Sequence, residues 1–182
     1  YRSLSYDNLP DLEDYREIYV VAWSMGVWAA SCLVPHLKMQ PRLVVALNGT
    51  ERPVDDQYGI PVKIYRLTEK GMDARGREKF FSRMVVTDED RQFLKGHLPS
   101  RELREQCEEL VLIEKQSQGC EKRCHWDKVY VSEKDVIFPP GNQLNWWKEK
   151  APVALLAGGH YPFTSFKSWE DILGIEVLSG NI

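Results

Sequence analysis

The sequence lacks long apolar runs, internal repeats and low-complexity segments. Crossing a bilayer takes roughly 20 consecutive apolar residues, so we expect no membrane span. The net charge is only −3 over 182 residues, and we expect no nucleic-acid partner. No signal peptide is visible, which favours the cytoplasm, and the opening Tyr1 indicates that the chain begins part-way into a protein. The length and the 43% hydrophobic content predict one domain with its own core.

Cysteine is also scarce, with four residues in all. Cys120, Cys124 and His125 superficially resemble a metal site, but zinc sites usually offer two paired groups of ligands. The only other nearby candidate is Cys107, so we expect neither a metal nor an organic cofactor. We also expect reduced thiols, with Cys32 as a small core residue.

The stretch around Ser24 joins a predicted strand to a predicted helix. Residues 18–21 form an apolar, β-branched run typical of a buried strand, and a well-buried helix follows from Val27. The pattern G-x-S-x-G marks a nucleophile elbow, where a serine occupies a strained turn between small residues. This chain has Ala22 at the first small position and Gly26 at the second. A buried serine that only caps the helix is the alternative.

Further apolar runs predict a mostly parallel sheet. Strand, helix and strand follow each other over residues 18–47, which indicates a βαβ unit with a right-handed crossover. We expect a short helical turn at residues 11–15 and a short extended piece at residues 62–65. The other expected elements are strands at residues 43–47, 128–132 and 152–157, and helices at residues 143–150 and 169–173.

Residues 66–127 differ in character from the rest of the chain. They are rich in charged, helix-favouring residues, with apolar side chains at helical spacing around Phe80 and again over residues 102–115. We therefore expect a single α/β domain with a core of residues 1–65 and 128–182. A helical cap of residues 66–127 covers the strand ends, and its many charges most simply form a solvated helix face.

Asp135 and His160 each follow a predicted strand, at the edge where open parallel sheets collect functional groups. With Ser24 they give the chain order of nucleophile, acid and base found in α/β-hydrolases. A serine hydroxyl needs an imidazole to take its proton, and a carboxylate must orient that imidazole. The sequence thus predicts a catalytic triad of Ser24, Asp135 and His160. The competing carboxylates are Glu133, Asp127 and Asp171.

Several motifs together resemble one family, the BioG-type carboxylesterases that release pimelate in biotin synthesis. They are Ala22-Trp23-Ser24-Met25-Gly26-Val27-Trp28, Asn48-Gly49-Thr50 with Gly59-Ile60-Pro61, and Gly159-His160-Tyr161-Pro162-Phe163. The resemblance implies an α/β-hydrolase that cleaves the methyl ester of pimeloyl-acyl-carrier protein and releases methanol. It also implies that Met25 supplies an oxyanion-hole N–H, with Trp23 beside it at the substrate.

Family members carry an N-terminal strand and a Gly-Trp-Gly-like loop ahead of the region where this chain starts. That loop should supply a second oxyanion donor, and losing one donor raises a barrier by about 2.7–4 kcal/mol. The resemblance further implies an acidic carrier-protein partner, recognised by basic residues of the expected cap. These are Arg75, Arg77, Lys79, Arg83, Arg101 and Arg104.

Two other functions fit the same residues. A thioesterase or a broad small-ester hydrolase would use the same three side chains, and one scaffold hosts many activities. A non-catalytic, hydrolase-like module that binds an acyl-carrier protein is the alternative outside enzymes.

Overall fold

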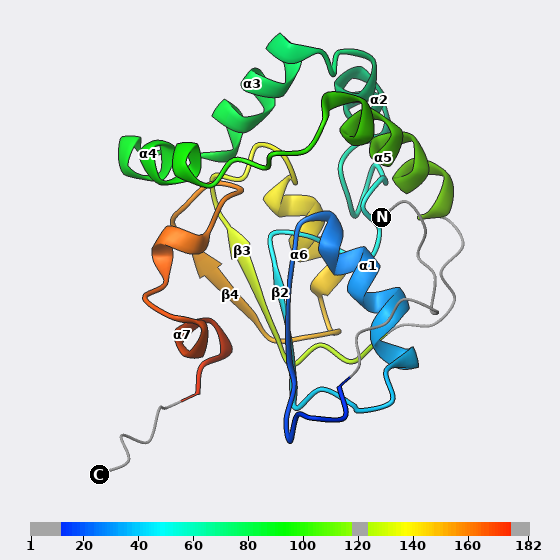
Figure 1. Ribbon diagram of the computed structural model, residues 1–182, viewed down its shortest axis with the longest axis vertical. Coiled ribbons are helices and arrows are strands. Elements are labelled where there is room, and N and C mark those ends of the chain that lie inside the picture. Colours follow the sequence, from blue (N-terminus) through cyan, green and yellow to red (C-terminus); the bar gives the residue numbers. More distant parts are fainter. Residues whose placement is uncertain (1–11, 118–123, 176–182) are drawn as a thin grey trace.

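A four-stranded parallel sheet forms the centre of the computed structural model, which describes residues 12–117 and 124–175 (Figure 1). The strands lie side by side in chain order. They are β1 (Tyr19–Trp23), β2 (Leu43–Leu47), β3 (Lys128–Ser132) and β4 (Val153–Leu156). Because all four run the same way, their carboxyl ends meet at one edge of the sheet.

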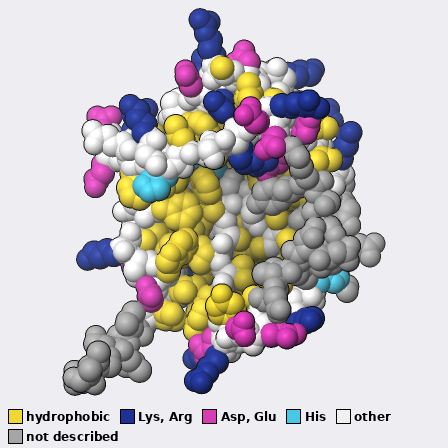
Figure 2. Space-filling model, viewed as in Figure 1, with side chains coloured by type: hydrophobic (Ala, Val, Ile, Leu, Met, Phe, Trp, Pro, Cys, Tyr) yellow, Lys and Arg dark blue, Asp and Glu magenta, His cyan; other side chains and the backbone are white. Residues whose placement is uncertain are grey.

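The two central strands, β2 and β3, are nearly continuous apolar runs and are buried on both faces, whereas the edge strand β4 leaves Val153 and Leu155 exposed. On one face Ala46 and Val131 pack beneath α1 (Met25–Leu33) and α6 (Pro140–Trp147). On the other face Leu47 and Tyr130 pack against α7 (Trp169–Leu173). Figure 2 shows further hydrophobic side chains gathered on this second side, between α4 and α7. These two layers fix the strand ends from which the functional loops begin.

Four helices between β2 and β3 lie beyond the carboxyl ends of the strands (Figure 1). We call them the α2–α5 segment. Charged side chains gather over its upper helices in Figure 2. The helices are α2 (Val62–Lys70), α3 (Ala74–Met84), α4 (Asp88–Gly96) and α5 (Leu103–Gln116). Two short 3-10 helices, Val34–His36 and Phe163–Ser165, complete the described elements.

The mixed α/β fold with a parallel sheet is as predicted, and two local predictions are wrong. Residues 62–65 are the first turn of α2 and not an extended piece, because Tyr65 is buried on the helix face that meets α5 and its hydroxyl donates to Leu110 O. Residues 12–15 form a single hydrogen-bonded turn without a helix. Helix α6 begins three residues earlier than predicted, at Pro140, a residue suited to a first helical turn. The division into a core and a cap of residues 66–127 stays a prediction.

Across the described part of the chain, no helix has both the length and the apolar character that crossing a membrane requires.

Candidate active site

Ser24 lies at the turn between β1 and α1 with φ 57° and ψ −126°. A positive φ at a residue other than glycine costs about 1–3 kcal/mol and persists only where the surroundings enforce it. Here the Ser24 N–H donates to Leu47 O at 2.9 Å, which ties the turn to β2. The turn also needs Gly49, because a Cβ at that position would lie 2.3 Å from Ser24 O. The sequence therefore builds a strained turn that holds the serine at the strand ends.

The structure brings the three predicted triad side chains into one hydrogen-bonded chain. His160 Nε2 lies 2.8 Å from Ser24 Oγ, and His160 Nδ1 lies 2.9 Å from Asp135 Oδ2. The histidine is fully buried and the aspartate is 3% exposed. Ser24 follows β1, Asp135 follows β3 and His160 follows β4, so the three residues meet at the carboxyl edge of the sheet. In this arrangement an imidazole can accept the serine proton while a carboxylate orients it.

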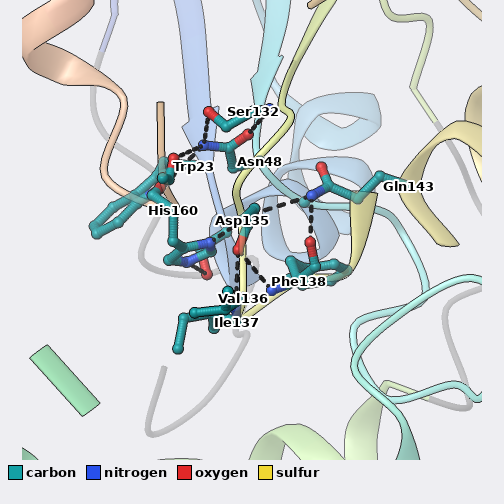
Figure 3. Close-up of polar contacts among 12 residues, drawn as sticks. Trp23, Asn48, Ser132, Asp135, Val136, Ile137, Phe138, Gln143 and His160 are labelled. Carbon is teal, nitrogen blue, oxygen red and sulfur yellow. Dashed lines mark hydrogen bonds and ion pairs between the residues drawn. The ribbon is translucent and has the colours of Figure 1, made fainter. Parts of the chain in front are cut away.

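The carboxylate of Asp135 accepts four hydrogen bonds (Figure 3). Its Oδ1 accepts from the backbone N–H groups of Ile137 and Phe138, at 2.9 and 2.8 Å. Its Oδ2 accepts from His160 and from Gln143 Nε2, the latter at 3.1 Å. These donors fix the plane of the carboxylate against the imidazole.

The competing carboxylates have other contacts. Glu133 is exposed, Asp127 Oδ2 accepts from the Val44 N–H, and Asp171 Oδ2 accepts from the Lys167 N–H. The carboxylate that the structure joins to the imidazole is that of Asp135.

Asn48 holds the backbone of the histidine loop, a role that the sequence did not reveal. Its Nδ2 lies 3.1 Å from Gly159 O, 3.0 Å from His160 O and 2.8 Å from Ser132 Oγ, while its Oδ1 accepts from the Ser132 N–H at 2.7 Å. Figure 3 shows its contacts with Ser132 and His160, and the side chain is fully buried. The signal available in the sequence was an asparagine directly after a buried strand, but its partners are 84 to 112 residues away.

We expect Asn48→Ala to lower the free energy of unfolding by about 2–4 kcal/mol, because it removes the Asn48 hydrogen bonds of the Gly159 carbonyl and the Ser132 N–H at a fully buried position. Urea denaturation at constant slope measures the change. The loss of the loop contacts should also lower turnover. As a control, Asn145→Ala removes an exposed amide from α6 and should leave stability within about 0.5 kcal/mol of wild type. Equal stability of the two variants would contradict the role of Asn48.

Trp23 contacts the histidine from a second side. Its indole N–H donates to His160 O at 2.8 Å, and its ring centroid lies 5.3 Å from that of the imidazole. The indole N–H is therefore engaged with the protein backbone, while the ring contributes to the wall of the cavity described next. Met25 is the first residue of α1, and its side chain lines the same cavity.

A cavity of about 190 Å³ opens at Ser24 and extends among α2, α3 and α5. Its wall is mainly apolar and includes Phe80, Met84, Ile113 and Ile137. The polar side chains that line it from α3 and α5 are Arg77, Arg83, Gln106 and Glu109. Ser24 thus lines a cavity that is mainly apolar but also has charged and polar groups in its wall.

The structure separates the predicted carrier-binding residues into two groups. Four of them lie on α3, where Arg77 and Arg83 line the cavity and Arg75 and Lys79 are exposed. Arg83 Nη2 also donates to the carbonyl of Val136, next to Asp135.

The other two basic residues are paired with glutamates of α5. Arg101 contacts Glu109 and lies 3.8 Å from Glu105. Arg104 lies 2.8 Å from Glu108. Their charges are therefore partly offset, whereas no ion pair is found for the four basic residues of α3 among the described residues.

The described residues contain no group of three or more His, Cys, Asp or Glu side chains that could hold a metal ion. Cys120 lies outside the described residues, so the spacing that resembled a metal site stays untested. Burial, followed by the charge of Glu51, raises the pKa of Cys124 to about 12, which keeps this thiol protonated. Cys107 and Cys124 are free, whereas Cys32 is disulfide-bonded, so the expectation of reduced thiols is wrong for Cys32.

A parallel sheet with a strained serine at the first strand–helix turn is the architecture of α/β-hydrolase-like proteins. A solved α/β hydrolase, MGS-M2 from a deep-sea metagenome library, shares this fold with a TM-score of 0.54 at 15% identity, covering 94% of this chain and 70% of that one. The chain has an α/β-hydrolase-like fold. It belongs to the BioG family of pimeloyl-ACP methyl esterases, whose model matches residues 1–172.

Individual proteins are similar to this chain over most of its length. The crystal structure of selenomethionine BioG from Haemophilus influenzae has a TM-score of 0.83 and 34% identity, covering 94% of this chain and 79% of that one. A Bacteroides fragilis protein named malonyl-acyl-carrier protein O-methyltransferase is 39% identical over 163 residues, and an uncharacterized H. influenzae protein is 36% identical over 163 residues. The matches cover 88% and 87% of this chain, but 33% and 74% of those proteins.

Proposed function

We propose that this chain is a serine carboxylesterase of biotin synthesis that hydrolyses the methyl ester of pimeloyl-acyl-carrier protein in the cytoplasm. The observation that carries the proposal is the hydrogen-bonded chain from Ser24 through His160 to Asp135, whose serine lines a mainly apolar cavity. Membership of the BioG family supplies the substrate class.

In the first half-reaction, Ser24 Oγ attacks the ester carbonyl carbon while His160 Nε2 takes the hydroxyl proton. Asp135 stabilises the imidazolium that forms. The carbonyl oxygen becomes an oxyanion, which the backbone N–H of Met25 stabilises. As the first residue of α1, Met25 has an N–H without an acceptor inside the helix, and the helix dipole favours negative charge there.

The tetrahedral intermediate then collapses, and the bond between the carbonyl carbon and the methoxy oxygen breaks. His160 gives its proton to that oxygen, so methanol leaves and an acyl ester on Ser24 remains. In the second half-reaction His160 takes a proton from water, whose oxygen attacks the acyl carbon. Return of the proton to Ser24 Oγ releases a free carboxylic acid at the end of the acyl chain.

The cavity fits a substrate whose ester lies at the far end of an aliphatic chain. Burying each methylene group against apolar walls contributes about 0.8 kcal/mol. With the ester at Ser24, the methylene chain lies along Phe80 and Ile113, and the carrier-linked end lies toward the polar groups of α3 and α5. The apolar wall therefore orients the chain so that the terminal ester reaches the nucleophile.

Labelling with a fluorophosphonate tests for catalysis, and the adduct should map to Ser24. The ratio of kcat/KM for the carrier-bound methyl ester to that for acyl thioesters then tests the substrate. A folded, full-length protein that takes no label would overturn the esterase proposal, and carrier binding without turnover would favour the binding module. Preference for thioesters would identify a thioesterase.

We expect the double variant Arg75→Glu/Lys79→Glu to raise KM for the carrier-bound ester about tenfold, with no change for a small free ester. Both side chains are exposed on α3, beside the cavity, where positive charge would attract an acidic carrier. The increase should shrink with added salt, because charges are screened over roughly 8–10 Å. Steady-state kinetics at two ionic strengths measures it.

Lys38→Glu is the control for this experiment and is compared with the single variant Lys79→Glu, because each of these reversals changes the net charge by −2. Lys38 is an exposed lysine that follows the C-terminal end of α1, whereas Ser24 lies at the N-terminal end of that helix. Its reversal makes the net charge more negative without altering the α3 surface. Equal effects of Lys38→Glu and Lys79→Glu would show that overall charge, and not a surface on α3, guides the carrier.

A further inference from the structure

Gln143 makes a contact with the acid of the proposed triad that the mechanism above does not use. It lies in the first turn of α6 and is fully buried. Its Nε2 donates to Asp135 Oδ2 at 3.1 Å and to Phe138 O at 2.7 Å (Figure 3). We propose that Gln143 is a positioning residue that holds the Asp135 carboxylate in line with His160. Its catalytic consequence rests on the proposed function, but the contact itself does not.

The orientation of the Gln143 amide follows from its neighbours. Asp135 Oδ2 and Phe138 O are both acceptors, so only the NH₂ end of the amide can face them. Its Oε1 is then buried without a hydrogen-bond partner among the described residues. A buried unsatisfied acceptor costs about 1–3 kcal/mol. The fold therefore keeps Gln143 Oε1 unsatisfied, while Nε2 of the same side chain donates to Asp135 and Phe138.

The carboxylate needs this second contact on Oδ2. Its Oδ1 is held by two backbone N–H groups, but Oδ2 would otherwise have His160 as its single donor in the described structure. A second donor from another direction prevents rotation of the carboxylate away from the imidazole.

The same amide also positions a side chain that packs on the histidine. The Phe138 ring lies parallel to the imidazole, at an interplanar angle of 7° and a centroid distance of 6.5 Å. Because Gln143 binds the Phe138 carbonyl, one side chain fixes both the carboxylate and the backbone next to the imidazole. Helix α6 is itself anchored, since Trp147 is buried and its Nε1 donates to Gly49 O at 2.9 Å.

The test compares Gln143→Met with Asn142→Leu. Methionine keeps the length and volume of glutamine but cannot donate. Asn142 is the neighbouring side-chain amide on α6, and it also bridges two carbonyls, those of Asp56 and Gly59, at 3.1 and 2.8 Å. Asn142→Leu thus removes a similar pair of hydrogen bonds from the same turn of helix without touching the carboxylate of Asp135.

The first measurement is the NMR signal of the His160 Nδ1–H proton, which requires no substrate. In the wild-type protein this proton lies in the 2.9 Å contact between His160 Nδ1 and Asp135 Oδ2. Loss of the Gln143 donor lets the carboxylate rotate, so the proton should exchange with water about tenfold faster in Gln143→Met and at the wild-type rate in Asn142→Leu. A folded Gln143→Met protein with wild-type exchange would overturn the proposal.

The second measurement is the pH profile of kcat/KM for a small methyl ester. At the optimum, kcat should fall about tenfold in Gln143→Met with KM unchanged, whereas Asn142→Leu should keep the wild-type values. If wild-type protein hydrolyses no ester, the proposed function fails while the exchange of the His160 proton still tests Gln143.

A measurement on the unaltered protein covers the case in which Gln143→Met does not fold. The side-chain NH₂ protons of Gln143 should exchange slowly with water and show nuclear Overhauser contacts to the Asp135 side chain, because the amide is buried and donates to Asp135 Oδ2. Fast exchange and the absence of these contacts would contradict the proposed contact.

Discussion

Ser24→Ala should lower kcat for the carrier-bound methyl ester by about 10⁶-fold and abolish fluorophosphonate labelling. The substitution removes the atom that attacks the ester and leaves the imidazole without the hydroxyl now 2.8 Å away. Substrate binding should change little, because the apolar cavity wall is intact. Turnover measured at saturating substrate, with a binding assay on the carrier-bound ester, separates the two effects.

Ser31→Ala is the matched control. Ser31 lies on α1, the helix that follows Ser24, and is fully buried. Its hydroxyl donates to Trp28 O inside α1 and does not reach the triad. Its loss should alter stability slightly and leave labelling at Ser24 complete. Turnover of Ser24→Ala within tenfold of wild type would show that another nucleophile, or no covalent step, performs the reaction.

The sheet could be predicted because its strands are short apolar runs. Strands β2 and β3 lie where their valine-rich segments predicted them, and β4 lies within its predicted range. Parallel strands with both faces covered need no alternation, so a plain apolar run is a sufficient signal. The meeting of Ser24, Asp135 and His160 followed from the same fact, because residues that follow parallel strands share one edge of the sheet.

The supporting hydrogen bonds could not be predicted in this way. Asn48 binds backbone groups of residues 132, 159 and 160, and Gln143 binds a carboxylate whose position depends on the end of β3. Such contacts join elements that are distant in sequence and leave no local pattern. The first turn of α2 was missed for a different reason, because a short β-branched run suits a strand or a helix until its buried partner is known.

The charged residues in α5 and just before it have a spacing in the sequence that predicts ion pairs. Arg101 and Arg104 each precede a glutamate by four residues, a spacing that pairs charges along a helix. This spacing would have set these two arginines apart from the exposed basic residues of α3.

Asp135→Asn should lower kcat by about 10⁴-fold while the protein stays folded. The amide oxygen can take the place of Oδ1 and accept from the N–H groups of Ile137 and Phe138. The amide nitrogen would then occupy the Oδ2 position and face His160 Nδ1 and Gln143 Nε2, which are both donors in the native site. His160 escapes this conflict by moving its proton to Nε2, and in that tautomer it cannot accept the proton of Ser24.

The loss of an acceptor for Gln143 should also lower the free energy of unfolding by about 1–3 kcal/mol. Denaturation separates this effect from the kinetic one, because a loss of that size leaves most molecules folded. Glu133→Gln is the control, since it neutralises an exposed carboxylate two residues away and should retain wild-type turnover. If Asp135→Asn retained wild-type turnover and Glu133→Gln lost it, the role of the acid would belong to Glu133. If both variants kept full turnover, the imidazole would need no carboxylate, and the buried contact between Asp135 and His160 would be purely structural.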